Sequence, residues 1–349
     1  MNRRNECLDI IRGVAVILMV FGHCIQYGNG VEYSQPNHFF YDKVFQVIYS
    51  FHMPLFMILS GYLFAFTLQK CHSFGDFAKN RFQRILLPII GWQTVDFAER
   101  GIKLIGTGQM SLAFLVEYVR SWFEGSWFLW AVFYCSIAVF IVQFYMKGNC
   151  LIYAAGLILT FFAPDYIYNM ELYKFMYPFF IGGYLFAICQ EKWKTKYFRV
   201  TLKHIFTSSA ICYLVLLVFW NYDAYIYTSG YTLLGCENLR YQFIIDIYRM
   251  LIGFAGSIVM ITGIYLIYHS KLNLHRIYTL IGKIGKASLG IYLISGILVG
   301  RLLIRHLEYY SFNYFNNVIQ AVIIIGISYL CTALIGKIKG LNFILLGGR

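Results

Sequence analysis

The first apolar segment of the chain carries side chains that could do acid–base chemistry. Arg12 and His23 are eleven residues apart, close to three full helical turns, so a helix places both on one face, about 16.5 Å apart along its axis. Asp9 precedes Arg12 by three residues and can pair with it. Histidine accepts a proton near neutral pH, whereas arginine keeps its charge. The segment therefore offers a proton acceptor deep in an apolar helix and a fixed positive charge near its start.

A second histidine lies in the next apolar segment. His52 precedes Pro54 by two residues, and the proline leaves a backbone carbonyl free for another partner. A charge within a membrane helix costs at least about 2.5–3.5 kcal/mol, so each ionisable group there needs a reason. Two histidines and an arginine that face one interior favour a functional site. The alternative is structural: Asp9 and Arg12 would anchor the helix at the interface, and His23 would hydrogen-bond a neighbouring helix.

The elements that must position these side chains are membrane helices. Of the 349 residues, 59% are hydrophobic and 13% are charged, too few charges to cover a soluble protein, so a soluble enzyme is excluded. The apolar runs are about 20 residues long, which is enough to cross a bilayer. No stretch has the composition of a linker, so we expect an all-α, polytopic integral membrane protein with one domain, 1–349. Ten transmembrane helices are expected near 8–27, 44–68, 85–105, 127–146, 150–167, 175–190, 205–227, 243–268, 287–304 and 317–336.

The orientation in the membrane follows from the distribution of Lys and Arg. With the N-terminus inside, 19 of the 29 lie in segments predicted to be cytoplasmic and five in segments predicted to be outside, so both termini are expected to be cytoplasmic. The net charge of +13 lies in short clusters between apolar runs, which indicates topology and not a nucleic-acid partner. The nine cysteines are scattered singly, so neither a metal site nor a disulfide framework is indicated.

One internal repeat is visible in the sequence. The run Phe51 to Phe56, followed by Gly61 to Ala65, resembles the run Phe175 to Phe180, followed by Gly183 to Ala187. The chain contains 32 Phe and 30 Tyr, so such likenesses arise easily. We attribute this one to chance or to shared packing.

Several motifs together resemble the membrane acyltransferase 3 family, and within it the stand-alone, fucose 4-O-acetylase-like branch. The motifs span nearly the whole chain and follow one another in order. They are Arg12 and His23 with ten residues between them, the run Phe51-His52-Met53-Pro54 continuing through Ser60-Gly61-Tyr62, the pair Arg81 and Arg84, the run Gly125-Ser126-Trp127, and the segment Ala287 to Leu293 with Tyr292.

The resemblance implies a ten-helix, multi-pass enzyme of the bacterial inner membrane. Such enzymes move an acyl group, usually acetyl, from cytoplasmic acyl-coenzyme A to a hydroxyl of a cell-surface sugar. It implies His23 and Arg12 as catalytic residues, supported by Asp9, His52 and Ser60. It further implies acetyl-coenzyme A as donor, a glycan or lipid-linked sugar as acceptor, contact with membrane lipid, and no metal.

The chain departs from the family pattern at two places. After Trp127 it continues Phe-Leu-Trp130 and lacks the carboxylates that many members carry nearby. After Leu293 it reads Ile294 and Ser295, whereas the late motif usually ends in Leu-x-His. The roles of those carboxylates and of that histidine are expected to be absent or replaced.

O-acyl transfer is chemistry that the residues of the first helix could perform. A hydroxyl needs a base to become a nucleophile, and the thioester oxygen needs positive or donor groups as it becomes negative. His23 could be the base, and Arg12 could orient the donor. An intermediate that carries the acyl group on His23 is equally compatible with the sequence.

A basic cluster could bind the donor. Lys79, Arg81 and Arg84 precede an apolar segment, and phosphate groups of coenzyme A are natural ligands for such side chains. The positive-inside signal and attraction to anionic lipid would select the same residues. We expect both effects to contribute.

An aromatic and acidic cluster could bind the acceptor. Trp122, Glu124 and Trp127 lie in and after the outer loop 106–126, where they could stack on a sugar and hydrogen-bond to it, although a tryptophan belt at the interface gives the same pattern. A second group, Asp96, Glu99 and Arg100, could line the acceptor side. Asp246 and Arg249 are three residues apart and are expected to pair for structural reasons.

Two other functions are compatible with the sequence. A carrier or flippase of a lipid-linked sugar would also need buried charges between helices, and it would be favoured by paired broken helices in two related halves. An acyltransferase acting on a lipid or a small amino acid would share the donor chemistry.

Overall fold

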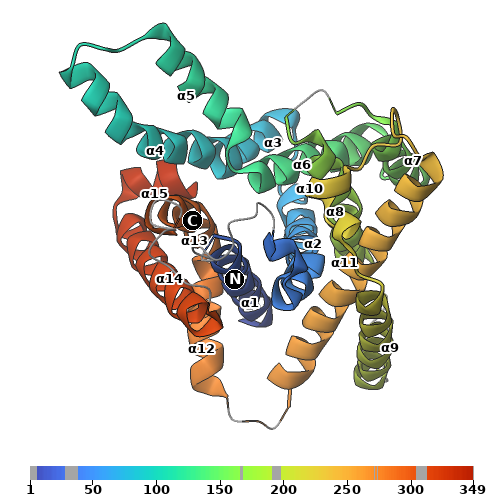
Figure 1. Ribbon diagram of the computed structural model, residues 1–349. Helices are drawn as coiled ribbons and strands as arrows, with labels where there is room; N and C mark the ends of the chain where they lie inside the picture. The colour runs from blue at the N-terminus through green and yellow to red at the C-terminus, as the bar shows by residue number, and fades with distance from the viewer. Residues whose placement is uncertain are drawn as a thin grey trace.

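The computed structural model describes residues 6–27, 38–165, 168–190, 198–270, 272, 274–303 and 313–348. Within these ranges all regular structure is helical, which confirms the all-α prediction (Figure 1). The elements are α1 (Glu6–Tyr27), η2 (His38–Tyr41), α2 (Lys43–Leu68), α3 (Phe74–Arg81), η3 (Phe82–Leu86), α4 (Leu87–Gly106), α5 (Leu112–Glu124), α6 (Trp127–Tyr145), α7 (Cys150–Phe162), α8 (Met170–Cys189), α9 (Phe198–Val218), η5 (Tyr222–Ala224), α10 (Ile226–Ser229), α11 (Leu239–Tyr268), α12 (His275–Lys286), α13 (Ser288–Leu298), η6 (Val299–Leu303), α14 (Tyr314–Lys337) and α15 (Lys339–Leu346).

The described helices include a counterpart for each of the ten predicted spans. Seven of them are long and apolar enough to cross a membrane, namely α1, α2, α6, α8, α9, α11 and α14, and an eighth span results if α12 and the α13–η6 helix, bent by 73° at their junction, are taken as one. The remaining two, α4 and α7, do not meet these criteria: α7 has only 13 residues, and α4 contains four charged residues. The chain is a multi-pass membrane protein, and crossing by α4 and α7 stays a prediction.

The largest difference from a predicted boundary has a local cause. The helix expected over 205–227 ends at Val218, because the Asn221 side chain accepts a hydrogen bond from the Ala224 N–H and starts the short turn η5. The late helix begins at Ser288, one residue from the predicted start, but it is the second half of a pair that bends at Ala287, which the sequence did not reveal.

Side-chain contacts group the predicted inner segments at one end of the bundle and the predicted outer segments at the other. This agrees with alternating helix directions through a membrane, while the side that faces the cytoplasm stays a prediction. The contacts at the predicted inner end are Tyr268 with Glu6 (2.9 Å) and Arg84 with the Gly348 carbonyl (3.4 Å), and those at the outer end are Tyr225 with the Phe40 carbonyl (3.1 Å) and Tyr314 with Asp42.

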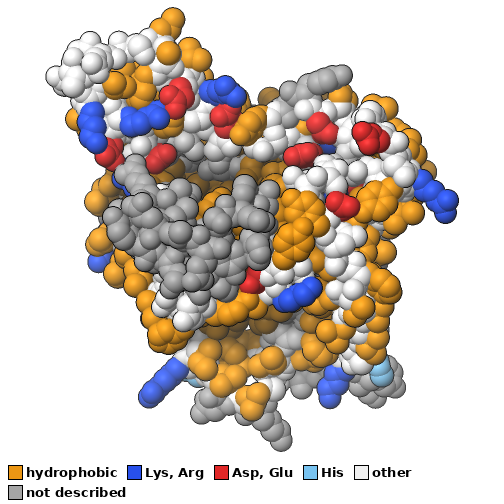
Figure 2. All heavy atoms as spheres, in the orientation of Figure 1, with side chains coloured by type: hydrophobic (Ala, Val, Ile, Leu, Met, Phe, Trp, Pro, Cys, Tyr) orange, Lys and Arg blue, Asp and Glu red, His pale blue; other side chains and the backbone are white. Residues whose placement is uncertain are grey.

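Hydrophobic side chains are spread over much of the lower and right parts of the face seen in Figure 2, and charged side chains gather over α4, α5 and neighbouring segments at its top. Large apolar side chains are exposed on α7, α9 and α14, among them Leu151, Val218 and Val322. Such exposure would be unfavourable in water but suits contact with lipid tails.

The internal repeat of the sequence is explained by the crossing of α2 and α8. A Cβ atom at Gly61 would lie 2.0 Å from the Phe180 carbonyl oxygen, and one at Gly183 would lie 1.9 Å from the Ile58 carbonyl oxygen. Small residues at matching positions let the two backbones approach closely, as is common between membrane helices. The repeat therefore reflects reciprocal packing, one of the two explanations that the sequence left open.

Candidate active site

A cavity of about 1,040 Å³ lies among α1, α2, η3, α6 and the helices from α12 to α15. Among the described residues that line it, seven are basic and one, Asp76, is acidic. This excess of positive charge in a concave site favours an anionic ligand. The basic residues come from distant parts of the chain: Arg12, Lys70, Lys79, Arg81, Arg84, Lys283 and Lys286.

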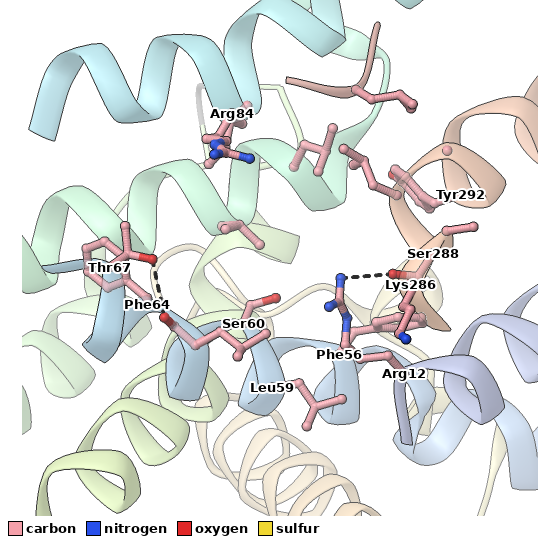
Figure 3. A pocket seen from close by; sticks show the side chains of 18 of the residues that line it. Arg12, Phe56, Leu59, Ser60, Phe64, Thr67, Arg84, Lys286, Ser288 and Tyr292 are labelled. Atoms are coloured by element: carbon pink, nitrogen blue, oxygen red, sulfur yellow. Dashed lines mark hydrogen bonds between the residues drawn. The ribbon is translucent and has the colours of Figure 1, made fainter. Parts of the chain in front are cut away.

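Arg12 lies in the wall of this cavity. Its guanidinium donates a hydrogen bond to Ser288 Oγ (3.1 Å), as Figure 3 shows, and lies 3.8 Å from the Asp9 carboxylate. Ser288 is the first residue of α13, and the bend at the α12–α13 junction brings it beside α1. The predicted pairing of Asp9 with Arg12 is confirmed, and Ser288 is a partner that the sequence did not reveal.

The cavity continues along α1 into an apolar interior. Met19, seven residues beyond Arg12, also lines it, together with Phe56, Phe128 and Tyr292. Seven residues of helix rise about 10.5 Å. The cavity is therefore elongated, with basic residues toward the predicted inner end and apolar ones deeper in the bundle.

Arg81 is the most buried of the basic residues near the predicted cytoplasmic mouth. Its side chain is only 7% exposed, and the guanidinium lies 4.8 Å from the centre of the Phe64 ring. Its Nε atom has no hydrogen-bond partner within the described part of the chain. Burial lowers the pKa of Arg81 to about 10, so it keeps its charge at neutral pH. A buried charge with an unused donor is suited to a charged ligand.

The neighbours of Arg81 differ in exposure. Arg84 belongs to the π-helical turn η3 and donates to the Gly348 carbonyl at 3.4 Å, while Lys79 is exposed on α3. A capping box of Ser73 and Asp76 begins α3 and fixes where this helix starts. The structure therefore brings all three predicted donor-binding residues to one cavity.

His23 does not line the large cavity. It lies one helical turn beyond Met19, and its Nδ1 atom is 3.2 Å from Gln26 Oε1 and 3.3 Å from the Tyr49 hydroxyl. Tyr49 in turn donates to Gln26 Oε1 at 3.1 Å. His23 is therefore held by a small polar network close to the deep end of the cavity.

A second, much smaller cavity of about 40 Å³ adjoins this network. His52, Tyr49, Met53 and Trp127 line it, and Met53 lines the large cavity as well. The Nδ1 atom of His52 is 2.9 Å from the Ile48 carbonyl oxygen. The predicted supporting residue His52 and the predicted sugar-binding residue Trp127 therefore share this site, whereas Ser60 lies in the large one (Figure 3).

The other residues predicted to contact a sugar lie elsewhere. Glu124 pairs with Arg120 on α5, and the carbonyl of Trp122 accepts a hydrogen bond from the Trp130 indole at 2.8 Å. Neither Trp122 nor Glu124 is among the described residues that line the two cavities.

The acidic residues of α4 form ion pairs. Asp96 and Glu99 lie 3.6 and 3.7 Å from Arg301, and Arg100 pairs with Glu117 at 2.7 Å. All five side chains are at least partly exposed. Their placement gives no direct support for a role on the acceptor side.

Sequence reasoning missed part of the large cavity. Lys70, Lys283 and Lys286 counted only as topology signals, but all three line it. A signal was present, since Lys283 and Lys286 directly precede the late motif that begins at Ala287. Ser295, which stands near the usual place of the late histidine, donates to the Tyr292 carbonyl of its own helix at 3.1 Å.

Among the described residues, no group of three or more His, Cys, Asp or Glu side chains lies close enough together to hold a metal ion. The groups in and beside the two cavities that could do chemistry include the two histidines, Arg12 with Ser288, and the basic cluster.

Comparison with known proteins adds independent findings. A family model described as an acyltransferase domain matches residues 5–337. The nodulation protein NolL of Mesorhizobium japonicum is 27% identical over 304 residues, which cover 84% of this chain and 76% of that protein. The nodulation protein NolL of Sinorhizobium fredii is 29% identical over 239 residues, which cover 65% of this chain and 61% of that protein. No solved structure matches.

Proposed function

This chain belongs to the acyltransferase 3 family, and from that premise we propose that it moves an acetyl group from cytoplasmic acetyl-coenzyme A to a hydroxyl of a cell-surface or lipid-linked sugar. Its membership and its membrane helices establish a membrane acyltransferase. The donor, the sugar acceptor and the bacterial inner membrane as its location are parts of the proposal.

The observation that carries the choice of donor is the shape and charge of the large cavity. Coenzyme A has phosphate groups at one end and a thin arm that ends in the thioester at the other. The cavity matches this pattern, because its basic residues, Arg81 and Lys286 among them, lie toward the predicted inner end while Phe56 and Met19 line its deeper part. A donor whose phosphates stay near Arg81 would direct its thioester along α1 toward His23.

Arg12 lines the cavity between these two ends, and we assign it the role of acting on the donor. Its guanidinium, held by Ser288 and Asp9, is a fixed positive charge that can orient the arm and stabilise negative charge on the thioester oxygen. Two routes use His23. As a base, it takes the hydroxyl proton while the acceptor oxygen attacks the thioester directly. As a nucleophile, it carries the acyl group between two steps.

Support for a sugar acceptor comes from the family resemblance and from the aromatic wall of the small cavity. Trp127 lies in that wall together with Trp220 and Tyr225. Aromatic side chains beside hydrogen-bonding groups suit a sugar hydroxyl and the carbon that carries it, which combine a polar and an apolar part.

The proposal is tested with membranes that contain the protein and with labelled acetyl-coenzyme A. His23→Ala should abolish entry of label into glycans at an unchanged level of protein in the membrane, and Arg12→Lys should lose most of it because a point charge does not replace a planar fork. His269→Ala, an exposed histidine at the end of α11, is the matched control. Near-normal labelling by His23→Ala would refute the central role of that residue.

Mass spectrometry of surface glycans separates an acyltransferase from a carrier. Cells with the protein should show sugars that gain an acetyl group relative to cells without it. A carrier would change the amount of exported glycan and leave its acetylation unchanged. Acetyl gained by lipids alone would identify a lipid acceptor.

A further inference from the structure

The small cavity is lined by the imidazole of His52, which has no assigned role in the two routes described above. We infer that His52 is the base that takes the proton of the acceptor hydroxyl, and that His23 is the residue that carries the acyl group. This inference rests on the proposed function and deepens it, because it assigns the acceptor's reacting group to the small cavity.

The hydrogen bond of His52 fixes which ring nitrogen is the base. Its Nδ1 atom lies 2.9 Å from the Ile48 carbonyl oxygen, and a carbonyl can only accept, so Nδ1 carries the hydrogen. In the neutral ring Nε2 then carries no hydrogen and can accept a proton. The side chain is only 2% exposed and belongs to the wall of the small cavity. A buried imidazole with a fixed tautomer is arranged as a proton acceptor and not as a donor.

The size and walls of the cavity define the group that it admits. A volume of about 40 Å³ is room for about three water-sized groups, so it accepts a hydroxyl and its carbon but not a sugar ring. Tyr225 and Tyr227 line it toward the predicted outer end, and Met53 lines both this cavity and the large one. An alcohol that approaches from outside thus meets His52 on the side opposite to the donor.

The outer wall of the small cavity is held in place by a buried ion pair. Arg249, 2.7 Å from Asp246, donates to the carbonyls of Asp223 (2.7 Å), Ala224 (3.1 Å) and Gly230 (2.5 Å). These carbonyls flank the segment that contains Tyr225 and Tyr227. The pair, which the sequence predicted to be structural, therefore sets the position of the wall that faces His52.

Tyr49 connects the two histidines. Its ring centre lies 6.4 Å from that of His23 and 4.6 Å from that of His52, and its hydroxyl is 3.3 Å from His23 Nδ1. His23 is adjacent to the deep end of the donor cavity, whereas His52 belongs to the small one. This arrangement assigns the acyl group to His23 and the hydroxyl to His52.

The two steps balance as follows. A nitrogen of His23 attacks the thioester carbon, the carbon–sulfur bond breaks, and coenzyme A leaves as a thiolate. The acceptor oxygen then attacks the acyl carbon, its proton moves to His52 Nε2, and the bond between carbon and nitrogen breaks with its electron pair returning to His23. His52 releases its proton, which neutralises the thiolate. The net change is acyl-coenzyme A and an alcohol to an ester and coenzyme A.

The test uses membranes with the intact protein and two measurements. One is entry of labelled acetyl into the glycans of those membranes, and the other is exchange of labelled coenzyme A into acetyl-coenzyme A without glycan acetylation. His52→Asn keeps an amide donor near the position of Nδ1 and lacks the base. Glycan labelling should fall at least about 100-fold, while exchange and the donor KM stay within about twofold of wild type. Added imidazole should restore part of the glycan labelling to His52→Ala.

Several results would overturn the inference. Glycan labelling by His52→Asn within threefold of wild type would show that His52 is not the base. Equal loss of glycan labelling and of coenzyme A exchange, without rescue by imidazole, would show that His52 has a structural role. If wild-type membranes label glycans but do not exchange labelled coenzyme A into acetyl-coenzyme A, then His23 does not carry the acyl group. If wild type labels no glycan at all, the proposed function itself fails, and that outcome is distinct from the others.

Discussion

Removal of the buried charge of Arg81 should weaken donor binding without slowing turnover. Arg81 is 7% exposed and has an unused donor atom, so a hydrogen bond from it to phosphate forms away from bulk water. Loss of one such charged hydrogen bond costs about 1.5–3 kcal/mol, which corresponds to a rise of about 10- to 150-fold in the donor KM of Arg81→Ala. Because the phosphates do not react, kcat should stay near wild type.

Two neighbours provide a graded comparison. Lys79 is exposed, and an exposed charge contributes about 0.2–1 kcal/mol, so Lys79→Ala should raise the donor KM by less than about sixfold. Arg84 is partly exposed, so Arg84→Ala should raise the donor KM by a factor between those of Lys79→Ala and Arg81→Ala. Since burial lowers the pKa of Arg81 only to about 10, its charge is lost as the pH rises through that value, and the donor KM of wild type should be flat between about pH 6 and 8.5 as far as Arg81 determines it.

The assay is a donor titration in membranes with two donors. Acetyl-coenzyme A carries the phosphates, and S-acetylpantetheine has the same reactive arm without them. The difference between Arg81→Ala and wild type should be large with the first donor and absent with the second. Equal effects of the three substitutions, loss of turnover alone at saturating donor, or an equal loss with both donors would show that the basic cluster is a topology signal and not a coenzyme site.

Two further predictions concern the fold. Gly61→Val should destabilise the protein by about 1–3 kcal/mol or prevent its accumulation, because a Cβ there would lie 2.0 Å from the Phe180 carbonyl oxygen. Thermal unfolding in detergent measures this, with Gly326→Val as the control, because an added Cβ at Gly326 would meet no atom of another element within 4 Å in the described part of the chain. Equal stability of both variants would contradict the packing argument. A reporter that works only in the cytoplasm should be active when fused after Arg349 and inactive when inserted in 228–240, and activity of the inserted reporter would refute the predicted orientation.

The helices were predictable from sequence because hydropathy is a local property. The segments of α1 and α2 have apolar runs that match the membrane thickness, and their positions agree with the structure to within two residues at most ends. The end of α9 at Val218 was missed because a single capping side chain, Asn221, outweighs the continuing apolar sequence. The bend at Ala287 was missed because no proline marks it.

The site was only partly predictable because its residues meet through long-range packing. The spacing of Arg12 and His23 predicts that they share one face of a helix. It does not predict that Met19 lies at the deep end of one cavity and His23 just beyond it. The contact of Arg12 with Ser288 joins residues 276 positions apart. No periodicity within one segment contains that information, and in the sequence Lys70 and the pair Lys283 and Lys286 resemble independent topology signals.

The position of Met53 bears on how the membrane stays sealed during the reaction. Its side chain lines both cavities. A hydrated ion would need a continuous water path, whereas an acyl group bound to a residue needs none. On the proposed mechanism, a transferase built this way passes a small apolar group between compartments without a continuous path for hydrated ions, and a smaller residue at position 53 is expected to open such a path.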